Sequence, residues 1–308
     1  MPPRSSVAPA RRVEGVDVSA SSLRTTLGAL RHGGGDPTTI VRRDELWRAT
    51  LTPDGPATVR IGWATGRLAV RAWGPGADWL GARAEQMAGL HDPGHRFHDA
   101  HPAIMRAQRN HPDLRLGASG TLYHDLLPTV IAQRITGGEA ARQWSRLCWR
   151  LGEPAPGPEL HLRLPPTPER LAHTPSWWFH PLGIERGRAE TLRTVARHAD
   201  RVWEWSRLDP AVCASRLSLL PGVGEWTIGT VLASALGEPD AIAVGDYHLK
   251  NIVAHALTGQ PRGTDEQMVE LLAPYRPHRG RVMRLLLLDG HRAPAFGPRQ
   301  RILPLHRW

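Results

Sequence analysis

The segment LLPGVGEWTIG, residues 219–229, places two glycines around one valine directly before an amphipathic run. Glycine has no Cβ and therefore lets another backbone approach closely. A helix that begins at such a turn presents free amides and the positive end of its dipole, which together can bind a phosphate. The pattern predicts contact with a nucleic-acid backbone, and the alternative is an ordinary turn between two helices, capped by glycine.

Asp246 is the second candidate for chemistry. It follows the loop EPDAIAVG and precedes the periodic run YHLKNIVAHAL, which predicts that it sits at the N-cap of a helix. Capping alone is the usual role of an aspartate in this place, and helix amides also keep a carboxylate ionised. A fixed negative charge beside a phosphate-binding turn repels DNA, so it makes sense if it faces a cation that develops during a reaction.

Trp226 lies outside the apolar stripe of the helix that follows the turn. At about 100° per residue it points roughly 200° away from Ile228, on the opposite face. Packing against another domain is one explanation for an aromatic residue there, and lining a pocket is the other. The stripe itself consists of Ile228, Val231, Leu232, Ala235 and Leu236.

The chain has 308 residues and a formal net charge of +10. This excess predicts a polyanionic partner, nucleic acid first, although a merely soluble basic protein has the same charge. Lys250 is the only lysine among the basic residues. The two cysteines, Cys148 and Cys213, are too few for a four-cysteine zinc site or an iron–sulfur cluster. Neither a signal peptide nor a membrane span is recognisable, so we expect a soluble, cytoplasmic protein.

Composition and periodicity divide the chain into three parts. Residues 1–35 are rich in Ser, Ala, Gly and Arg, which predicts a mobile basic tail. Residues 36–90 contain ELWRATL, ATVRIGW and RLAVRAW, whose alternation predicts a small antiparallel β-sheet domain, followed by a helix near 76–89. Residues 91–308 are expected to form a helical domain, which is irregular and His-rich over 91–118 and has helical patterns from about 119 onward, with the two helices around the glycine turn at about 210–236. The expected fold class is therefore α+β and mainly α.

The residues LPGVGEWTIGTVLASAL followed by AIAVGDYHLKN resemble the motif of the helix-hairpin-helix (HhH-GPD) DNA glycosylases. Within that superfamily the chain is most similar to bacterial 3-methyladenine DNA glycosylase II. The likeness covers about residues 38–300, where IAQRITGGEAARQW is similar to the minor-groove wedge segment and YRPHRGRVMRLLLL to the final helix. The resemblance implies an enzyme of base excision repair that acts as a monomer on double-stranded DNA.

The resemblance also implies a mechanism. Such enzymes flip an alkylated purine, of the 3-methyladenine or 7-methylguanine type, out of the duplex and hydrolyse its N-glycosidic bond. Asp246 matches the catalytic aspartate, which stabilises the positive charge that develops on the sugar. Trp226 matches an aromatic residue of the pocket that stacks on the cationic base. Tyr247 and His278 are further pocket candidates, and His278 stands where the relatives carry a second tryptophan.

The resemblance further implies contacts with DNA and with an ion. Arg134 stands where the 3-methyladenine relatives have a leucine as the wedge, and an arginine can fill the gap left by a flipped nucleotide by planar stacking. The main-chain carbonyls of Ser218, Leu220 and Val223 match those that hold an alkali ion, Na⁺ or K⁺, and no other cofactor is expected. The residues expected to contact DNA are Gln133, Arg134, Leu220, Pro221, Gly222, Val223, Gly224, Thr227, Lys250 and Arg279.

Ser215 stands where bifunctional relatives carry the lysine that forms a Schiff base and nicks the strand. We therefore expect a monofunctional hydrolase without lyase activity, in which only Lys250 or the N-terminal amine could substitute for that lysine. Two alternatives remain open: a glycosylase for oxidised or deaminated bases, and a non-catalytic helix-hairpin-helix DNA-binding protein. Asp246 argues against the second, because a pure binder gains nothing from an anion that faces DNA.

Overall fold

The N-terminal part of the protein is one antiparallel sheet with the strand order β1-β5-β4-β3-β2. The structure, a computed structural model, describes residues 11–64 and 66–294. The expected meander is present, because β3, β4 and β5 pair consecutively and alternate side chains of β5 are buried. The strands are β1 (Arg11–Glu14), β2 (Thr39–Val41), β3 (Glu45–Thr52), β4 (Gly55–Ala64) and β5 (Arg67–Trp73).

The prediction of a mobile tail over residues 1–35 is wrong from residue 11 onward, because the chain is structured there. Residues 1–10 lie outside the described part of the chain. β1 pairs with β5, and the helix α1 (Ala20–Gly28) begins at the capping side chain of Ser19. Leu23 and Leu27 of α1 are fully buried in the core beneath the sheet. These two leucines, one turn apart, are a weak apolar signal within a polar segment. The sheet domain therefore begins at residue 11 and not at residue 36.

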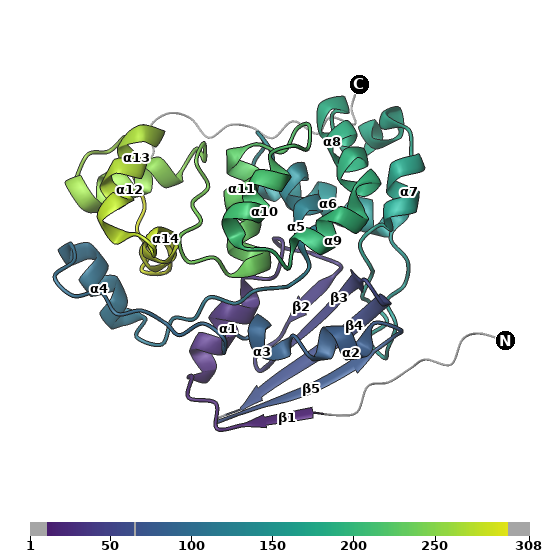
Figure 1. Ribbon diagram of the computed structural model, residues 1–308, viewed down its shortest axis with the longest axis horizontal. Helices are drawn as coiled ribbons and strands as arrows, with labels where there is room; N and C mark the ends of the chain where they lie inside the picture. Colours follow the sequence, from purple (N-terminus) through teal and green to yellow (C-terminus); the bar gives the residue numbers. More distant parts are fainter. Residues whose placement is uncertain (1–10, 65, 295–308) are drawn as a thin grey trace.

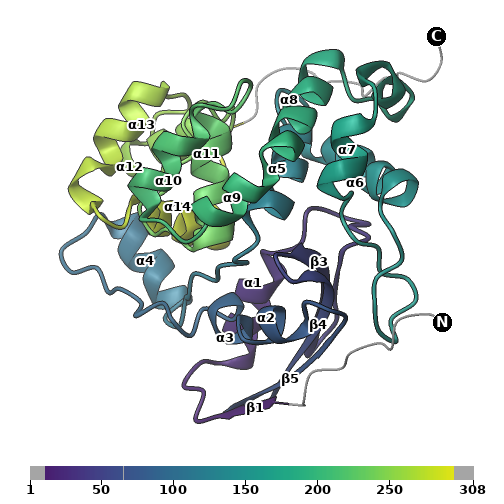
Figure 2. The ribbon, with the colours of Figure 1, turned by 45° about the vertical axis from the view of Figure 1, so that its right-hand side comes forward.

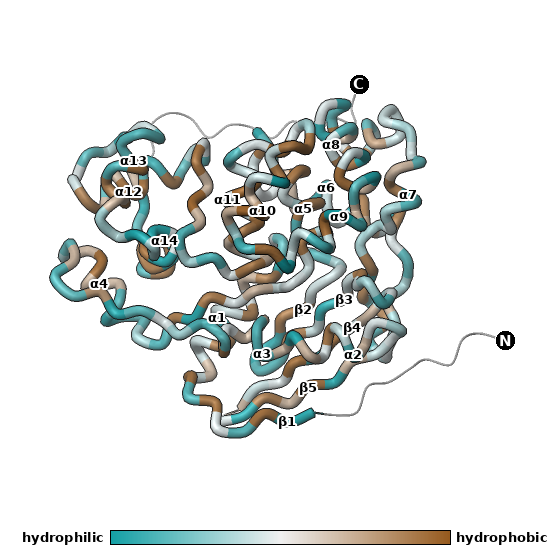
Figure 3. Tube along the Cα trace, in the orientation of Figure 1, coloured by the Kyte–Doolittle hydropathy of each residue, from teal (hydrophilic) through white to brown (hydrophobic). Residues whose placement is uncertain are grey.

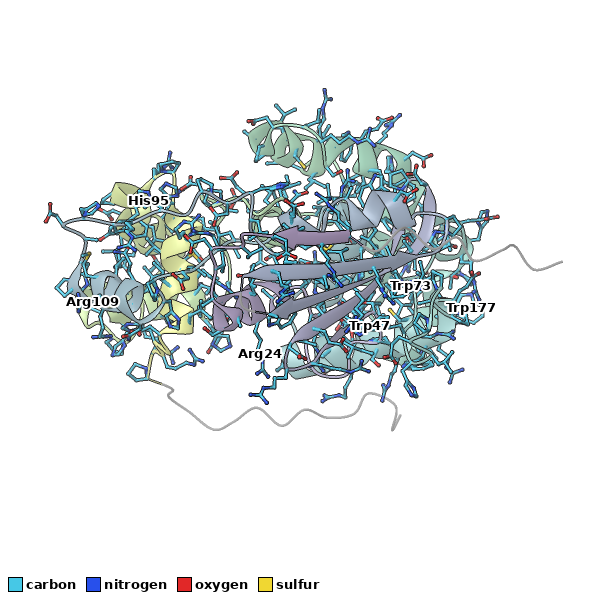
Figure 4. All side chains as sticks on the ribbon, turned by 90° about the horizontal axis from the view of Figure 1, so that it is seen from below. Arg24, Trp47, Trp73, His95, Arg109 and Trp177 are labelled. Atoms are coloured by element: carbon cyan, nitrogen blue, oxygen red, sulfur yellow. The ribbon has the colours of Figure 1, made fainter. Side chains whose placement is uncertain are left out.

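β3 is the strand that joins the sheet to the helical part. One of its faces contributes Leu46 to the core with α1 and the short helices α2 (Ala77–Gly81) and α3 (Ala84–Met87). The other face contributes Trp47 to the core of the helical part. The indole of Trp47 stacks on that of Trp73, with 5.3 Å between ring centroids and 12° between ring planes (Figure 4).

The remaining helices lie above and beside the sheet (Figures 1 and 2). Figure 3 shows apolar stretches alternating with polar ones along these helices, as expected for helices that bury one face. The helices are α4 (Pro102–Asn110), α5 (Leu122–Ile131), α6 (Gly137–Leu151), α7 (Pro168–His173), η1 (Ser176–Leu182), α8 (Arg186–Arg197), α9 (Ala199–Trp205), α10 (Pro210–Leu217), α11 (Glu225–Val231), the π turn η2 (Leu232–Leu236), α12 (Leu249–Thr258), α13 (Asp265–Leu272), η3 (Ala273–Tyr275) and α14 (Arg279–Leu288).

The helical part has two separate hydrophobic cores. Helices α5 to α11 surround one core, which we call the central lobe. Helices α4, α12, α13 and α14 surround the other, which includes Phe97 and Ile242 and which we call the C-terminal lobe (Figure 1). The chain passes from the first lobe to the second after Gly237, whose φ of +69° ends the π turn. Asp246 lies on this crossing segment.

A buried ion pair ties the sheet to the central lobe. The Arg48 side chain of β3 is fully buried, and its Nη2 donates to Oδ1 of Asp125 on α5 at 2.8 Å. Burial alone would raise the pKa of Asp125, but the Arg48 guanidinium, His32 and His124 together outweigh it and hold that pKa well below its ordinary value. Within the described residues, no helix is long and apolar enough to cross a membrane.

Candidate functional site

The glycine turn joins α10 to α11, and its two glycines serve different purposes. Gly222 has φ of +86°, and a Cβ added there would lie 2.0 Å from Oγ1 of Thr191 on α8. The chain's own packing therefore requires that glycine. Gly224 has φ of −99°, is exposed, and has nothing within 4 Å of an added Cβ. Of the two glycines, it is therefore Gly224 that leaves room for a visiting backbone.

Buried side chains anchor the turn, while its open backbone faces outward. Leu220 and Val223 are buried in the central core, so they can meet DNA only through their backbone. Pro221 is exposed, and so is Leu219, at 68%. Leu219 was not among the expected DNA contacts, although its place at the start of the turn is visible in the sequence.

The start of α11 has unoccupied amides. Gly224 is its N-cap and supplies no side chain to cap the helix. The amides of Gly224, Glu225 and Trp226 donate to none of the described residues. Free first-turn amides are the groups that bind a phosphate at a helix N-terminus.

The Asp246 carboxylate lies between α11 and α12. Its Oδ1 accepts the backbone amides of His248 at 2.8 Å and Leu249 at 3.0 Å. The expectation that Asp246 is the N-cap residue is wrong, because α12 begins at Leu249 with His248 as its N-cap residue, two residues after Asp246. Its carboxylate nevertheless accepts the amides at the start of that helix. The residue is half-buried, neither sealed in a core nor fully exposed to solvent.

Trp226 contacts this carboxylate from the central lobe. Its indole Nε1 donates to Oδ2 of Asp246 at 3.2 Å, and the indole is half-buried. A Cβ added to Gly245 would lie 3.9 Å from the Cβ of Trp226, so the segment before Asp246 packs against the same residue. The position of Trp226 outside the apolar stripe is thereby explained: it points across to the crossing segment.

The loop between α5 and α6 is attached to the turn. Nε2 of Gln133 donates to the carbonyl of Gly222 and to Oγ1 of Thr227, both at 2.9 Å. Thr227 is buried, so its side chain binds Gln133 instead of reaching out to DNA as expected. Arg134, the next residue, is exposed and has φ of +59°, a conformation that costs a non-glycine residue on the order of 1 kcal/mol or more. Its guanidinium makes no hydrogen bond or ion pair with the described residues.

Two of the expected pocket residues have other surroundings. Tyr247 is 67% exposed, and its ring packs edge-on against His248. Neighbouring residues of a non-helical segment point to different sides, so its adjacency to Asp246 does not bring it into a shared pocket. His278 stacks on His95 with 3.8 Å between ring centroids, and it meets Phe97 edge-on. Burial, together with His95 and Arg281, lowers the pKa of His278, so its ring is neutral at neutral pH.

Two of the expected DNA-binding cations are already paired. Nε and Nη2 of Arg279 donate to the two carboxylate oxygens of Asp240 at 2.9 and 2.6 Å. Nζ of Lys250 donates to Oδ2 of Asp265 at 2.9 Å, and not to Asp246 one turn earlier. Sequence reasoning missed Asp265, because an aspartate in the first turn of a helix such as α13 is explained by the helix dipole without reference to the site.

The structure offers no conventional metal site in its described part. No group of three or more His, Cys, Asp or Glu side chains there could hold a metal ion. Both cysteines, Cys148 and Cys213, are buried and free. His91 and His98 are exposed.

No protein-family model and no curated protein sequence matches the chain. Solved structures do match it. The 3-methyladenine DNA-glycosylase from Archaeoglobus fulgidus has a TM-score of 0.75 at 18% identity, over 91% of this chain and 98% of that chain. A structure of MBOgg1 in complex with a low affinity DNA ligand has a TM-score of 0.64 at 14% identity, over 92% and 96% of the two chains. The 8-oxoguanine glycosylase/lyase of Clostridium acetobutylicum, in complex with double-stranded DNA, has a TM-score of 0.60 at 11% identity, over 83% and 88%. The chain therefore has the fold of the helix-hairpin-helix DNA glycosylases, α+β and mainly α.

Proposed function

We propose that this protein is a monofunctional DNA glycosylase of base excision repair, which hydrolyses the N-glycosidic bond of a flipped, alkylated purine in duplex DNA. One observation carries the proposal. In a chain with the glycosylase fold, the Asp246 carboxylate is held by the amides at the start of α12 and by the Trp226 indole, next to the hairpin between α10 and α11.

Asp246 would act on the sugar. When the base leaves, positive charge develops at the anomeric carbon, and a fixed carboxylate stabilises that charge without having to reorganise. Oδ1 is turned away by two backbone amides, so Oδ2 is the oxygen left to face the sugar or an attacking water. Among residues 11–64 and 66–294, the Trp226 indole is the one donor to Oδ2, and it leaves a lone pair of that oxygen free.

Trp226 would also recognise the base. A purine alkylated at a ring nitrogen carries a positive charge, and a cation above an indole is attracted by about 1–2 kcal/mol when desolvated. Such a base is a good leaving group without protonation. The mechanism therefore needs no general acid, which agrees with a His278 whose pKa is lowered and whose ring stacks on His95.

The hairpin and the Arg134 loop would hold the duplex. The open amides at Gly224 and the exposed Arg134 face outward from segments that Gln133 ties together. The amides suit a phosphate, and the planar guanidinium suits the gap that a flipped nucleotide leaves in the stack. Binding by a chain of net charge +10 should weaken steeply as salt rises, because phosphate contacts release counterions.

The hairpin backbone also fits an alkali ion. The carbonyl of Leu220 accepts the amide of Val223 at 3.0 Å, whereas the carbonyls of Ser218 and Val223 accept no hydrogen bond from the described residues. Main-chain oxygens of this kind are the ligands that Na⁺ and K⁺ take. The three carbonyls would hold such an ion, and its charge would strengthen the attraction of the hairpin for a phosphate.

Hydrolysis without strand cleavage follows from the placement of amines. Ser215 has a hydroxyl that donates to the carbonyl of Ala211, and it provides no amine. Nζ of Lys250, the only lysine, is held in an ion pair with Asp265 instead of standing free as a nucleophile.

The test is to incubate the protein with duplexes that contain 3-methyladenine, 7-methylguanine or 8-oxoguanine and to identify the released bases by mass spectrometry. We expect release of the methylated purines, and loss of that release in Asp246→Asn with unchanged or tighter binding to DNA. Release of 8-oxoguanine alone would assign the oxidised-base alternative. Equal release by wild type and Asp246→Asn would refute the role of the carboxylate.

A further inference from the structure

The residues on both sides of Asp246 are tied to the α12–α13 region of the C-terminal lobe. Before Asp246, the amide of Gly245 donates to Oδ1 of Asp265 at 2.9 Å. After Asp246, the carbonyl of Tyr247 accepts Nδ2 of Asn251 at 2.9 Å. Asn251 is buried, and its Oδ1 accepts the amide of Gly263, just before α13. The segment that carries Asp246 is thus held on both sides by the side chains of Asp265 and Asn251, neither of which hydrogen-bonds to the carboxylate itself.

Gly245 is the point at which this attachment matters most. It is exposed, has φ of +92°, and its only neighbour near an added Cβ is the Cβ of Trp226 at 3.9 Å. A glycine of this kind has wide conformational freedom and no side chain to anchor it. The hydrogen bond to Asp265 is the contact that fixes its amide. Losing that bond would free the backbone directly before the carboxylate.

Asp265 is itself held rigidly. Its second oxygen, Oδ2, accepts Nζ of Lys250 at 2.9 Å, and Lys250 is on the first turn of α12, whose first amide binds Asp246. The pair neutralises Asp265, so a second carboxylate near the site does not add to the repulsion of DNA. Lys250 and Asp265 thereby link the start of α12 to the start of α13 across the segment that carries Asp246.

We propose that Asp265 is a positioning residue for the Asp246 carboxylate, acting through the Gly245 amide and the Lys250 ammonium. The inference rests on the proposed function for its effect on catalysis, while its structural part stands independently. Misplacing a catalytic group by about 1 Å can cost on the order of 100-fold in rate, whereas DNA affinity depends on the hairpin and Arg134, which Asp265 does not contact.

The experiment compares Asp265→Ala, Asp265→Asn and a matched control, Glu266→Ala, which removes the same charge from the neighbouring exposed residue of α13. Two quantities are measured on the full-length proteins. One is the single-turnover rate of 7-methylguanine release at saturating enzyme, alongside the Kd for the same duplex. The other is hydrogen exchange of peptides that cover residues 243–250.

We expect Asp265→Ala to slow release by about 10- to 100-fold with a Kd within about twofold of wild type, and to speed amide exchange across 243–250. Asp265→Asn keeps an oxygen that can accept the Gly245 amide, so it should recover part of the rate. Glu266→Ala should match wild type in both measurements.

The outcomes separate the two proposals. If wild type releases no base from any lesion duplex, the proposed function is wrong, and the exchange data alone then decide whether Asp265 holds the segment. If Asp265→Ala matches Glu266→Ala in exchange, Asp265 does not position Asp246. If wild type is active and Asp265→Ala releases the base as fast as Glu266→Ala, Asp265 has no effect on catalysis and that part of the inference is overturned.

Discussion

The indole nitrogen of Trp226 lies 3.2 Å from Oδ2 of Asp246, and this contact joins the central lobe to the crossing segment that leads into the C-terminal lobe. One residue therefore offers two different groups to the proposed reaction. Its ring face can stack on a base, while its N–H orients the carboxylate. Substitution can separate the two.

Trp226→Phe keeps an aromatic face and removes the N–H. A hydrogen bond to a charged group contributes about 1.5–3 kcal/mol, and less when it is long, so we expect base release to slow by about 3- to 10-fold. Trp226→Ala removes the ring as well and should slow release by about a further 10-fold, with weaker discrimination between methylated and normal purines. The measurement is the single-turnover rate of base release from a duplex with a methylated purine and from an unmodified duplex. Equal rates for the two variants would show that only the N–H matters.

The two hairpin glycines should respond in opposite ways to alanine. Gly222→Ala places a Cβ 2.0 Å from Oγ1 of Thr191 at a φ of +86°, so we expect a loss of about 2 kcal/mol or more of unfolding free energy. Thr191→Ala in the same chain should restore part of it. Gly224→Ala meets nothing and should leave the melting temperature unchanged while weakening DNA binding. Thermal melting and fluorescence anisotropy on one set of proteins make the comparison, and unchanged affinity in Gly224→Ala would place the DNA elsewhere.

Arg134 should matter for DNA and not for folding. Arg134→Gly relieves the strain of a φ of +59° and should be at least as stable as wild type, whereas Arg134→Ala keeps the strain. Both variants should bind duplexes with an abasic site more weakly, because the guanidinium that fills the gap is lost. The slope of log K against log salt concentration should also fall in magnitude by about 1 if Arg134 contacts a phosphate. Wild-type affinity in both variants would exclude this residue from the wedge.

The buried Arg48–Asp125 pair should make stability depend on acid pH. The pKa of Asp125 is lowered in the folded protein, so the unfolded chain binds the proton more readily and the stabilisation is complete only above the ordinary value of 3.8. Asp125→Asn leaves Arg48 without its buried partner, which should cost about 3–5 kcal/mol at neutral pH. The difference in unfolding free energy between Asp125→Asn and wild type should shrink as the pH falls below about 4. Urea unfolding at several pH values tests this, with Asp99→Asn, on an exposed loop residue, as the control.

The local features of the site could be predicted from the sequence, because they depend on neighbours in the chain. Glycine spacing and helical periodicity identify the turn, and they place Trp226 off the apolar stripe of its helix. An aspartate before a periodic run identifies a carboxylate at a helix start. These patterns need no knowledge of the rest of the fold, and the structure has each of them close to the expected residue.

The features that could not be predicted depend on contacts between distant segments. The Gly245 amide meets Asp265 only because α13 folds back beside the start of α12. Lys250 pairs with Asp265, fifteen residues later in the chain, because tertiary packing brings the starts of α12 and α13 together. The resemblance implied site roles for Tyr247 and Arg279, but Tyr247 is 67% exposed and Arg279 is ion-paired with Asp240.

The pairing of β1 with β5 has a practical consequence. Removing the first 37 residues, a choice that their polar composition invites, would delete β1 and α1 and leave the hydrogen-bonding groups of β5 unpaired along Arg67–Val70. It would also uncover the apolar surface on which Leu23 and Leu27 rest. An unpaired strand edge beside exposed apolar surface is a template for another chain, so such a shortened protein should self-associate into aggregates where the full-length chain stays dispersed.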